Sequence, residues 1–88
     1  MALDRGDYRW YVEPQDSHTN RVLAENTQEE NCHRGLETAD GKKDLWECSR
    51  SVVRRLVASS RDAKLKFNVY SRRGNGQIRN VNFLFFSN

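Results

Sequence analysis

The sequence predicts an α+β fold, in which a small antiparallel sheet of about four strands, in the order β-β-α-β-β, carries one amphipathic helix on one face. Three observations predict it: an alternating segment near the start of the chain, a segment of helical periodicity in its second half, and an alternating pair of segments after that helix. The chain has 88 residues, of which 36% are hydrophobic. This is enough for a single domain over residues 1–88, with a thin core.

The first strand is expected at residues 8–13, where apolar and polar side chains alternate and strand formers are frequent. Pro14 ends this strand, because proline has no amide hydrogen to donate to a β-ladder. Residues 16–20 are rich in turn formers, and residues 21–24 are typical of a returning strand. We therefore expect an N-terminal β-hairpin.

The stretch from residue 26 to residue 43 has two interpretations. Residues 27–30 fit a capping box, which predicts a short helix ending at Gly35. A polar loop accounts for the stretch equally well. Asp40 and Gly41 predict a turn in either case.

The main helix is expected at residues 45–61. Asp44 and Glu47 form a capping box, in which each side chain accepts a hydrogen bond from the backbone amide of the other residue. At about 100° per residue, the apolar side chains of this helix fall within one arc of about 140°. They are Leu45, Trp46, Val52, Val53, Leu56 and Val57. Cys48 lies at the border of the arc, where a small buried thiol is ordinary.

A second hairpin is expected after the helix. Residues 64–70 alternate, residues 74–76 (Gly-Asn-Gly) are a strong turn signal, and residues 81–86 return. The expected inward side chains are Leu65, Phe67, Val69, Val81, Phe83 and Phe85. Leu84 and Phe86 would face the other way, and would either be covered or present an apolar edge to a partner.

Membrane contact and export are not expected. No apolar run approaches the roughly 20 residues that cross a bilayer, and the first residues lack the apolar segment of a secretory signal. These features predict a cytoplasmic protein in which Cys32 and Cys48 are reduced thiols; a bridge between them is the alternative in an oxidising compartment. Trp10 and Trp46 are expected in the core, because few other large side chains can fill it.

Catalytic motifs are absent from the sequence, so we expect a non-enzymatic protein without a cofactor. It has no nucleophile elbow, no zinc-protease motif and no phosphate-binding loop. The residues that zinc prefers are Cys32, Cys48, His18 and His33, but their spacing matches no compact finger. No metal site is therefore expected.

Charge is distributed unevenly along the chain. Residues 1–48 carry 11 acidic and 6 basic side chains, a net charge of −5, whereas residues 49–88 carry 9 basic and 1 acidic, a net charge of +8. Such asymmetry favours an anionic partner for the basic half. The alternative is that the two halves neutralise each other when the chain folds.

The candidate site consists of basic residues of the helix and the second hairpin, together with one tyrosine. Arginine presents a planar fork that matches phosphate or carboxylate oxygens, and a tyrosine ring can stack on a base. The residues are Arg50, Arg54, Arg61, Lys64, Lys66, Tyr70, Arg72, Arg73 and Arg79. Lysine and arginine on solvated strands also serve solubility, which is the interpretation without a ligand.

Two functions are consistent with these features. The first is a small binding module whose basic C-terminal half docks on nucleic acid or a nucleoprotein complex by neutralising phosphates. The alternative is a protein-binding adaptor or inhibitor, of the kind that phages and mobile elements encode to block host machinery, which uses the same basic face on an acidic protein surface. In either case, residues 81–86 could pair with their own copy to form a homodimer.

Overall fold

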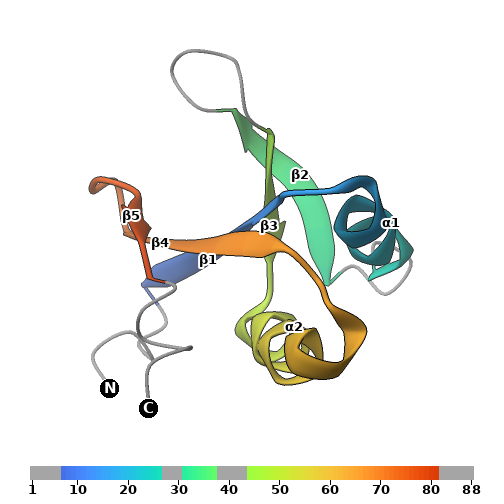
Figure 1. Cartoon of the computed structure of the whole chain (residues 1–88). Coiled ribbons are helices and arrows are strands. Elements are labelled where there is room, and N and C mark those ends of the chain that lie inside the picture. Colours follow the sequence, from blue (N-terminus) through green and yellow to red (C-terminus); the bar gives the residue numbers. More distant parts are fainter. Residues whose placement is uncertain (1–6, 27–30, 38–43, 82–88) are drawn as a thin grey trace.

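The computed structural model describes residues 7–26, 31–37 and 44–81. These residues form five strands and two helices (Figure 1). The elements are β1 (Tyr8–Pro14), α1 (Ser17–Asn26), β2 (Cys32–Glu37), β3 (Asp44–Cys48), α2 (Arg50–Ala63), β4 (Phe67–Arg73) and β5 (Arg79–Asn80). The predicted α+β class with an antiparallel sheet is confirmed. The predicted count of four strands and one helix is wrong, because the order of elements is β-α-β-β-α-β-β.

The sheet places β1 at its centre. All neighbouring strands are antiparallel, and their order is β2-β3-β1-β4-β5. Each helix therefore connects two parallel strands that are separated by one antiparallel strand: α1 links β1 to β2 across β3, and α2 links β3 to β4 across β1. Two interleaved units of this kind make the split β-α-β arrangement. The short β5 extends the sheet beyond β4.

Residues 21–24 belong to α1, so the predicted returning strand and N-terminal hairpin are wrong. The cause is Asp16, whose carboxylate oxygen Oδ1 accepts a hydrogen bond from the amide of Thr19 at 2.7 Å and thereby caps the helix. Thr19 and Leu23, four residues apart on one side of α1, are both buried. The turn formers begin a helix here, because Asp and Ser serve turns and helix caps through the same side-chain-to-backbone bonds.

Residues 26–43, for which the sequence allowed either a short helix or a polar loop, include the strand β2. β2 includes Gly35, so neither a helix ending there nor a loop describes it, while residues 27–30 and the predicted turn at residues 40–41 lie outside the described residues. β2 pairs with β3 so that Cys32 stands directly opposite Cys48, and the register shifts at Gly35.

The main helix begins later than predicted, because residues 44–48 form β3. The predicted capping box is therefore wrong. The N-cap of α2 is Ser49, whose Oγ accepts a hydrogen bond from the amide of Val52 at 3.4 Å. Val52, Val53 and Leu56 are buried, which confirms the predicted apolar face within α2.

A second hairpin after the helix is confirmed, but its strands are β4 (Phe67–Arg73) and the short β5 (Arg79–Asn80), and β5 precedes the predicted return at residues 81–86. Phe67 and Val69 are buried, and the half-buried Leu65 packs against the same core. Residues 74–76 form the turn, and the chain returns as β5 to the buried Val81. The remaining residues of the predicted strand, Phe83, Leu84, Phe85 and Phe86, lie outside the described residues, and with them lies the predicted homodimer edge.

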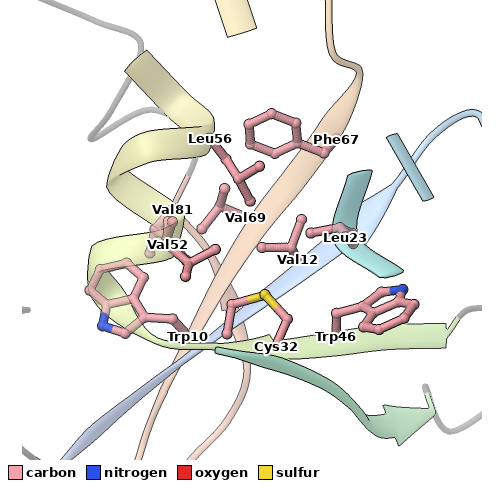
Figure 2. Close-up of a cluster of buried hydrophobic side chains, with 12 residues drawn as sticks. Trp10, Val12, Leu23, Cys32, Trp46, Val52, Leu56, Phe67, Val69 and Val81 are labelled. Carbon is pink, nitrogen blue, oxygen red and sulfur yellow. A yellow bond between two sulfur atoms is a disulfide. The ribbon is translucent and has the colours of Figure 1, made fainter. Parts of the chain in front are cut away.

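The core lies between the sheet and the two helices (Figure 2). Trp10 and Trp46 are each only 4% exposed, which confirms their predicted place in the core. In Figure 2, Trp10 lies beneath α2 and Trp46 beneath α1, with the paired cysteines between them. Trp46 also donates a hydrogen bond from Nε1 to Oδ1 of Asn20 at 3.2 Å, and the guanidinium of Arg34 lies 5.1 Å from its ring centroid.

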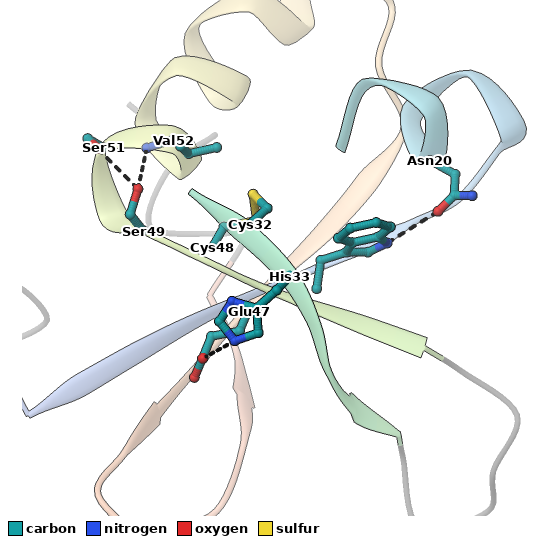
Figure 3. Close-up of a disulfide and its surroundings, with 9 residues drawn as sticks. Asn20, Cys32, His33, Glu47, Cys48, Ser49, Ser51 and Val52 are labelled. Carbon is teal, nitrogen blue, oxygen red and sulfur yellow. Dashed lines mark hydrogen bonds and ion pairs between the residues drawn. A yellow bond between two sulfur atoms is a disulfide. The ribbon is translucent and has the colours of Figure 1, made fainter. Parts of the chain in front are cut away.

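Cys32 and Cys48 form a disulfide bond between β2 and β3. The expectation of two reduced thiols is therefore wrong, and the alternative of a bridge is correct. The placement of Cys48 on the helix is also wrong, since its pairing partner in the sheet is Cys32. Both cysteines are buried on the side of the sheet that carries the helices (Figure 3).

Candidate nucleic-acid interface

The face of the sheet opposite the helices carries a row of polar side chains across all five strands. Strand pairing aligns His33 of β2, Glu47 of β3, Tyr11 of β1, Tyr70 of β4 and Asn80 of β5. Figure 3 shows His33 and Glu47 on this side of the sheet, with the disulfide and both helices on the other. We call this side the helix-free face.

Two arginines stand directly opposite each other on the helix-free face. Arg9 lies two residues before Tyr11 on β1 and so shares its side of the sheet, and Arg9 pairs with Arg72 of β4. The Cβ atoms of such a pair lie about 4.5–5.5 Å apart, and like charges in this position destabilise the sheet. The sheet thus holds two positive charges close together, at a cost in stability.

The carboxylates of the described residues compensate this pair only weakly. The closest is Glu47, whose Oε1 lies 3.7 Å from Nη1 of Arg9, but the Arg9 side chain is 69% exposed and water screens the attraction. Glu47 is also shared with His33, whose Nε2 lies 2.8 Å from Oε2. For Arg72, no carboxylate of the described residues lies within ion-pair distance, and its Nε is buried without a hydrogen-bond partner.

Tyr70 lies beside the arginine pair and is held by a buried carboxylate. Its hydroxyl donates to Oε1 of Glu13 at 3.0 Å, and the same oxygen accepts from Asn68 at 3.1 Å and from Gln15 at 2.9 Å. Burial raises the pKa of Tyr70, and the hydrogen bond to Glu13 raises it further. The ring therefore stays neutral and fixed. Tyr11, its cross-strand neighbour, is 4% exposed and offers little surface to a ligand.

We call Arg9, Arg72 and Tyr70 the arginine–tyrosine surface. The predicted site included Tyr70 and Arg72 but not Arg9. The sequence did offer one indication for Arg9, because its place in the alternating residues 8–13 puts it on the polar side of the first strand. Its pairing with Arg72, however, depends on a register between segments far apart in the chain.

The other predicted site residues lie elsewhere. Arg73 and Arg79 point to the helix side of the β4–β5 hairpin, because side chains alternate along a strand. Arg50 and Arg54 belong to α2, Lys64 caps its C-terminus with φ of 56°, and Lys66 follows. The side chain of Arg61 is outside the described residues. The structure therefore distributes the predicted residues over two faces, and a flat partner meets only part of them at once.

Metal binding finds no support in the described residues. The disulfide occupies both thiols of the cysteine–histidine set, so those sulfurs are not thiolate ligands. Within residues 7–26, 31–37 and 44–81, no group of three or more histidine, cysteine, aspartate or glutamate side chains is placed to hold a metal ion. Neither α1 nor α2 is long and apolar enough to span a membrane.

Comparison of the chain with protein-family models, with curated proteins and with solved structures found no match. The class of this protein is therefore defined by its own architecture, a small α+β domain with a five-stranded antiparallel sheet in the described residues.

Proposed function

We propose that this chain is a non-enzymatic binding module that docks single-stranded nucleic acid on its helix-free face, through Arg9, Arg72 and Tyr70. The observation that carries the proposal is the cross-strand arginine pair beside a fixed tyrosine. Two backbone phosphates, one bound to each guanidinium group, would offset the repulsion between the arginines, because each arginine offers a planar fork of donors to phosphate oxygens.

A single strand suits this surface better than a duplex. Unpaired bases stack on aromatic rings presented by a sheet, while arginines follow the backbone. A duplex would need a longer basic patch, but the hairpin arginines Arg73 and Arg79 point to the opposite side of the sheet. The helix-free face therefore supports a short contact, with two phosphates and one stacked base.

The compartment expected from the sequence is the cytoplasm, and this stays a prediction. The Cys32–Cys48 disulfide favours an oxidising compartment, where such bonds form and persist.

Fluorescence anisotropy with a labelled single-stranded oligonucleotide tests the proposal. Arg9→Gln/Arg72→Gln should weaken binding and make the slope of log K against log salt shallower by about 1.4, since each phosphate contact with a single strand contributes about 0.7. The matched control is Arg21→Gln/Arg55→Gln, which removes the same charge from exposed positions on α1 and α2. It should leave the slope nearly unchanged.

Stacking is tested separately at Tyr70. Tyr70→Leu should weaken oligonucleotide binding by about tenfold or more, because one stacked base contributes about 1–3 kcal/mol, whereas Tyr70→Phe keeps the ring and should retain most of the affinity. Equal losses in the Arg9/Arg72 variant and in the Arg21/Arg55 control would refute a localised interface. Binding that is independent of salt, or binding only to an acidic protein, would favour the adaptor alternative.

A further inference from the structure

A hollow of about 540 Å³ lies against the β4–β5 hairpin. Its lining includes Tyr8, Arg73, Gln77, Arg79 and Val81. Tyr8 and Arg73 are directly opposite each other on β1 and β4. Because consecutive side chains of a strand point to opposite faces, Tyr8, Arg73 and Arg79 of this hairpin hollow lie on the other side of the sheet from the arginine–tyrosine surface.

One arginine of the hollow is already held in place. Nε of Arg73 donates to Oδ2 of Asp7 at 2.9 Å, and this bond raises the pKa of Arg73. The bond engages only one of the five N–H groups of the guanidinium. Asp7 therefore favours one orientation of Arg73, although both side chains are largely exposed and water screens the pair.

The second arginine, Arg79, has an exposed side chain, and no carboxylate among the described residues lies within ion-pair distance of it. The hairpin that carries both arginines is tied down at its turn. The amide of Gly74 donates to the carbonyl of Asp7 at 3.0 Å, and the amide of Gly76 donates to the carbonyl of Arg73 at 2.8 Å. Two guanidinium groups and one carboxylate thus give the hollow a net positive charge before any ligand arrives.

The size of the hollow indicates more than a bare ion. Small-molecule sites commonly measure roughly 300–1,000 Å³ and combine apolar walls with a few placed polar groups. The half-buried Tyr8 and the buried Val81 supply apolar wall, and Gln77 supplies an amide. Paired arginines match phosphate oxygens in geometry as well as in charge.

We propose that the hairpin hollow binds a phosphate ester of nucleotide size, with Arg73 and Arg79 on the phosphate and Tyr8 and Val81 against the remainder of the ligand. The phosphate can belong to a free nucleotide or to the phosphorylated end of a nucleic-acid strand. This site does not depend on the arginine–tyrosine surface, because the two lie on opposite faces of the sheet.

The test is a titration of the disulfide-bonded, ¹⁵N-labelled full chain with adenosine 5′-monophosphate, followed by amide chemical shifts. Saturable shifts are expected at residues 71–81 and at Tyr8. Adenosine and inorganic phosphate should each bind at least about tenfold more weakly, since each lacks one half of the contacts. A pair of oligonucleotides with and without a 5′-phosphate distinguishes the two sources of the ligand: tighter binding of the phosphorylated strand indicates a strand end.

The decisive variant is Arg79→Gln, which changes an exposed side chain and should weaken binding of the monophosphate by about tenfold, or about 1.4 kcal/mol. Arg55→Gln, the same change on α2, should have no effect. The proposal is overturned if the monophosphate gives no saturable shifts, if Arg79→Gln and Arg55→Gln behave alike, or if citrate binds more tightly than the monophosphate. If Arg9→Gln/Arg72→Gln loses oligonucleotide binding but keeps monophosphate binding, ligand binding in the hairpin hollow is independent of the arginine–tyrosine surface.

Discussion

Removal of the Cys32–Cys48 cross-link should destabilise the protein strongly. The two cysteines are 16 residues apart in the chain. A cross-link that closes a loop of this length lowers the conformational entropy of the unfolded chain and thereby stabilises the native state by about 3 kcal/mol. Reduction removes this stabilisation. A chain of 88 residues has a total stability of about 4–13 kcal/mol at the usual 0.05–0.15 kcal/mol per residue. The bridge thus contributes a large fraction of the free energy of unfolding.

Urea denaturation measures this contribution. With a slope near 1 kcal/mol per molar urea for a small domain, the midpoint of the reduced protein should lie about 2–3 M below that of the oxidised protein. Reduction removes no side-chain heavy atom, so it tests the cross-link more directly than a substitution does. Cys32→Ala/Cys48→Ala should be less stable still, because both sites are buried and the lost sulfurs leave unfilled space.

Two results would refute this reasoning. The first is a pair of free thiols in the denatured protein before any reductant is added, which would mean that the bridge does not form. The second is an unchanged urea midpoint on reduction, which would mean that the unfolded chain is not constrained by the loop.

Three further predictions concern single side chains. Ser49→Ala should lower the free energy of unfolding by about 0.5–1 kcal/mol, because the amide of Val52 loses its cap; urea denaturation measures the loss. Hydrogen bonds from Thr19 lower the pKa of Asp16 below 3.8, so its stabilising effect is present above pH 3.8 and is lost as the pH falls through the lower value of the folded state. Asp16→Asn should therefore be less stable than wild type at neutral pH, and the two denaturation midpoints should converge in acid. Gly74→Ala should destabilise by about 0.5–1 kcal/mol in thermal unfolding, because Gly74 has a φ of 53°, although a methyl group would meet no atom there.

Local patterns were sufficient to predict the parts of the fold whose signals do not conflict. The Gly-Asn-Gly turn and the alternation around Phe67 and Val69 predict the second hairpin correctly, and the apolar face of α2 follows from Val52, Val53 and Leu56. These elements depend on neighbours within a few residues, so the chain near them contains the needed information.

The errors occurred where one residue type serves two structures. Leu45 and Trp46 continue the helical periodicity of α2, yet both are also compatible with a strand, and only Ser49 marks where the helix begins. Asp16 has the same ambiguity, since its carboxylate is suited to a turn between strands and to a helix cap. Pairing with β1 makes residues 44–48 a strand, and burial of Thr19 and Leu23 on one side of α1 favours the helix after Asp16.

The candidate site was harder to predict from the sequence than the secondary structure, because it joins residues that are far apart in the chain. Arg72 and Tyr70 belong to one alternating segment and could be placed together, but Arg9 joins them only because β1 inserts between β3 and β4. This insertion follows from the interleaved β-α-β units, each of which contains one helix. The sequence predicted α2 but indicated a strand in place of α1, so the insertion could not be foreseen.

The insertion of β1 also bears on the two interpretations of the uneven charge. If the acidic and basic halves only neutralised each other, every basic side chain beside β1 would meet a carboxylate. Arg73 does, through Asp7, but the preceding residue on β4, Arg72, meets Arg9 instead. Among the described residues, Asp7 thus pairs with Arg73 on the helix side and Glu47 pairs with Arg9 on the helix-free face, but no ion pair neutralises Arg72. The proposed anion on the helix-free face would supply negative charge beside Arg72. Repulsion between the two aligned arginines reduces the stability of the sheet, and binding of the proposed anion would offset that loss.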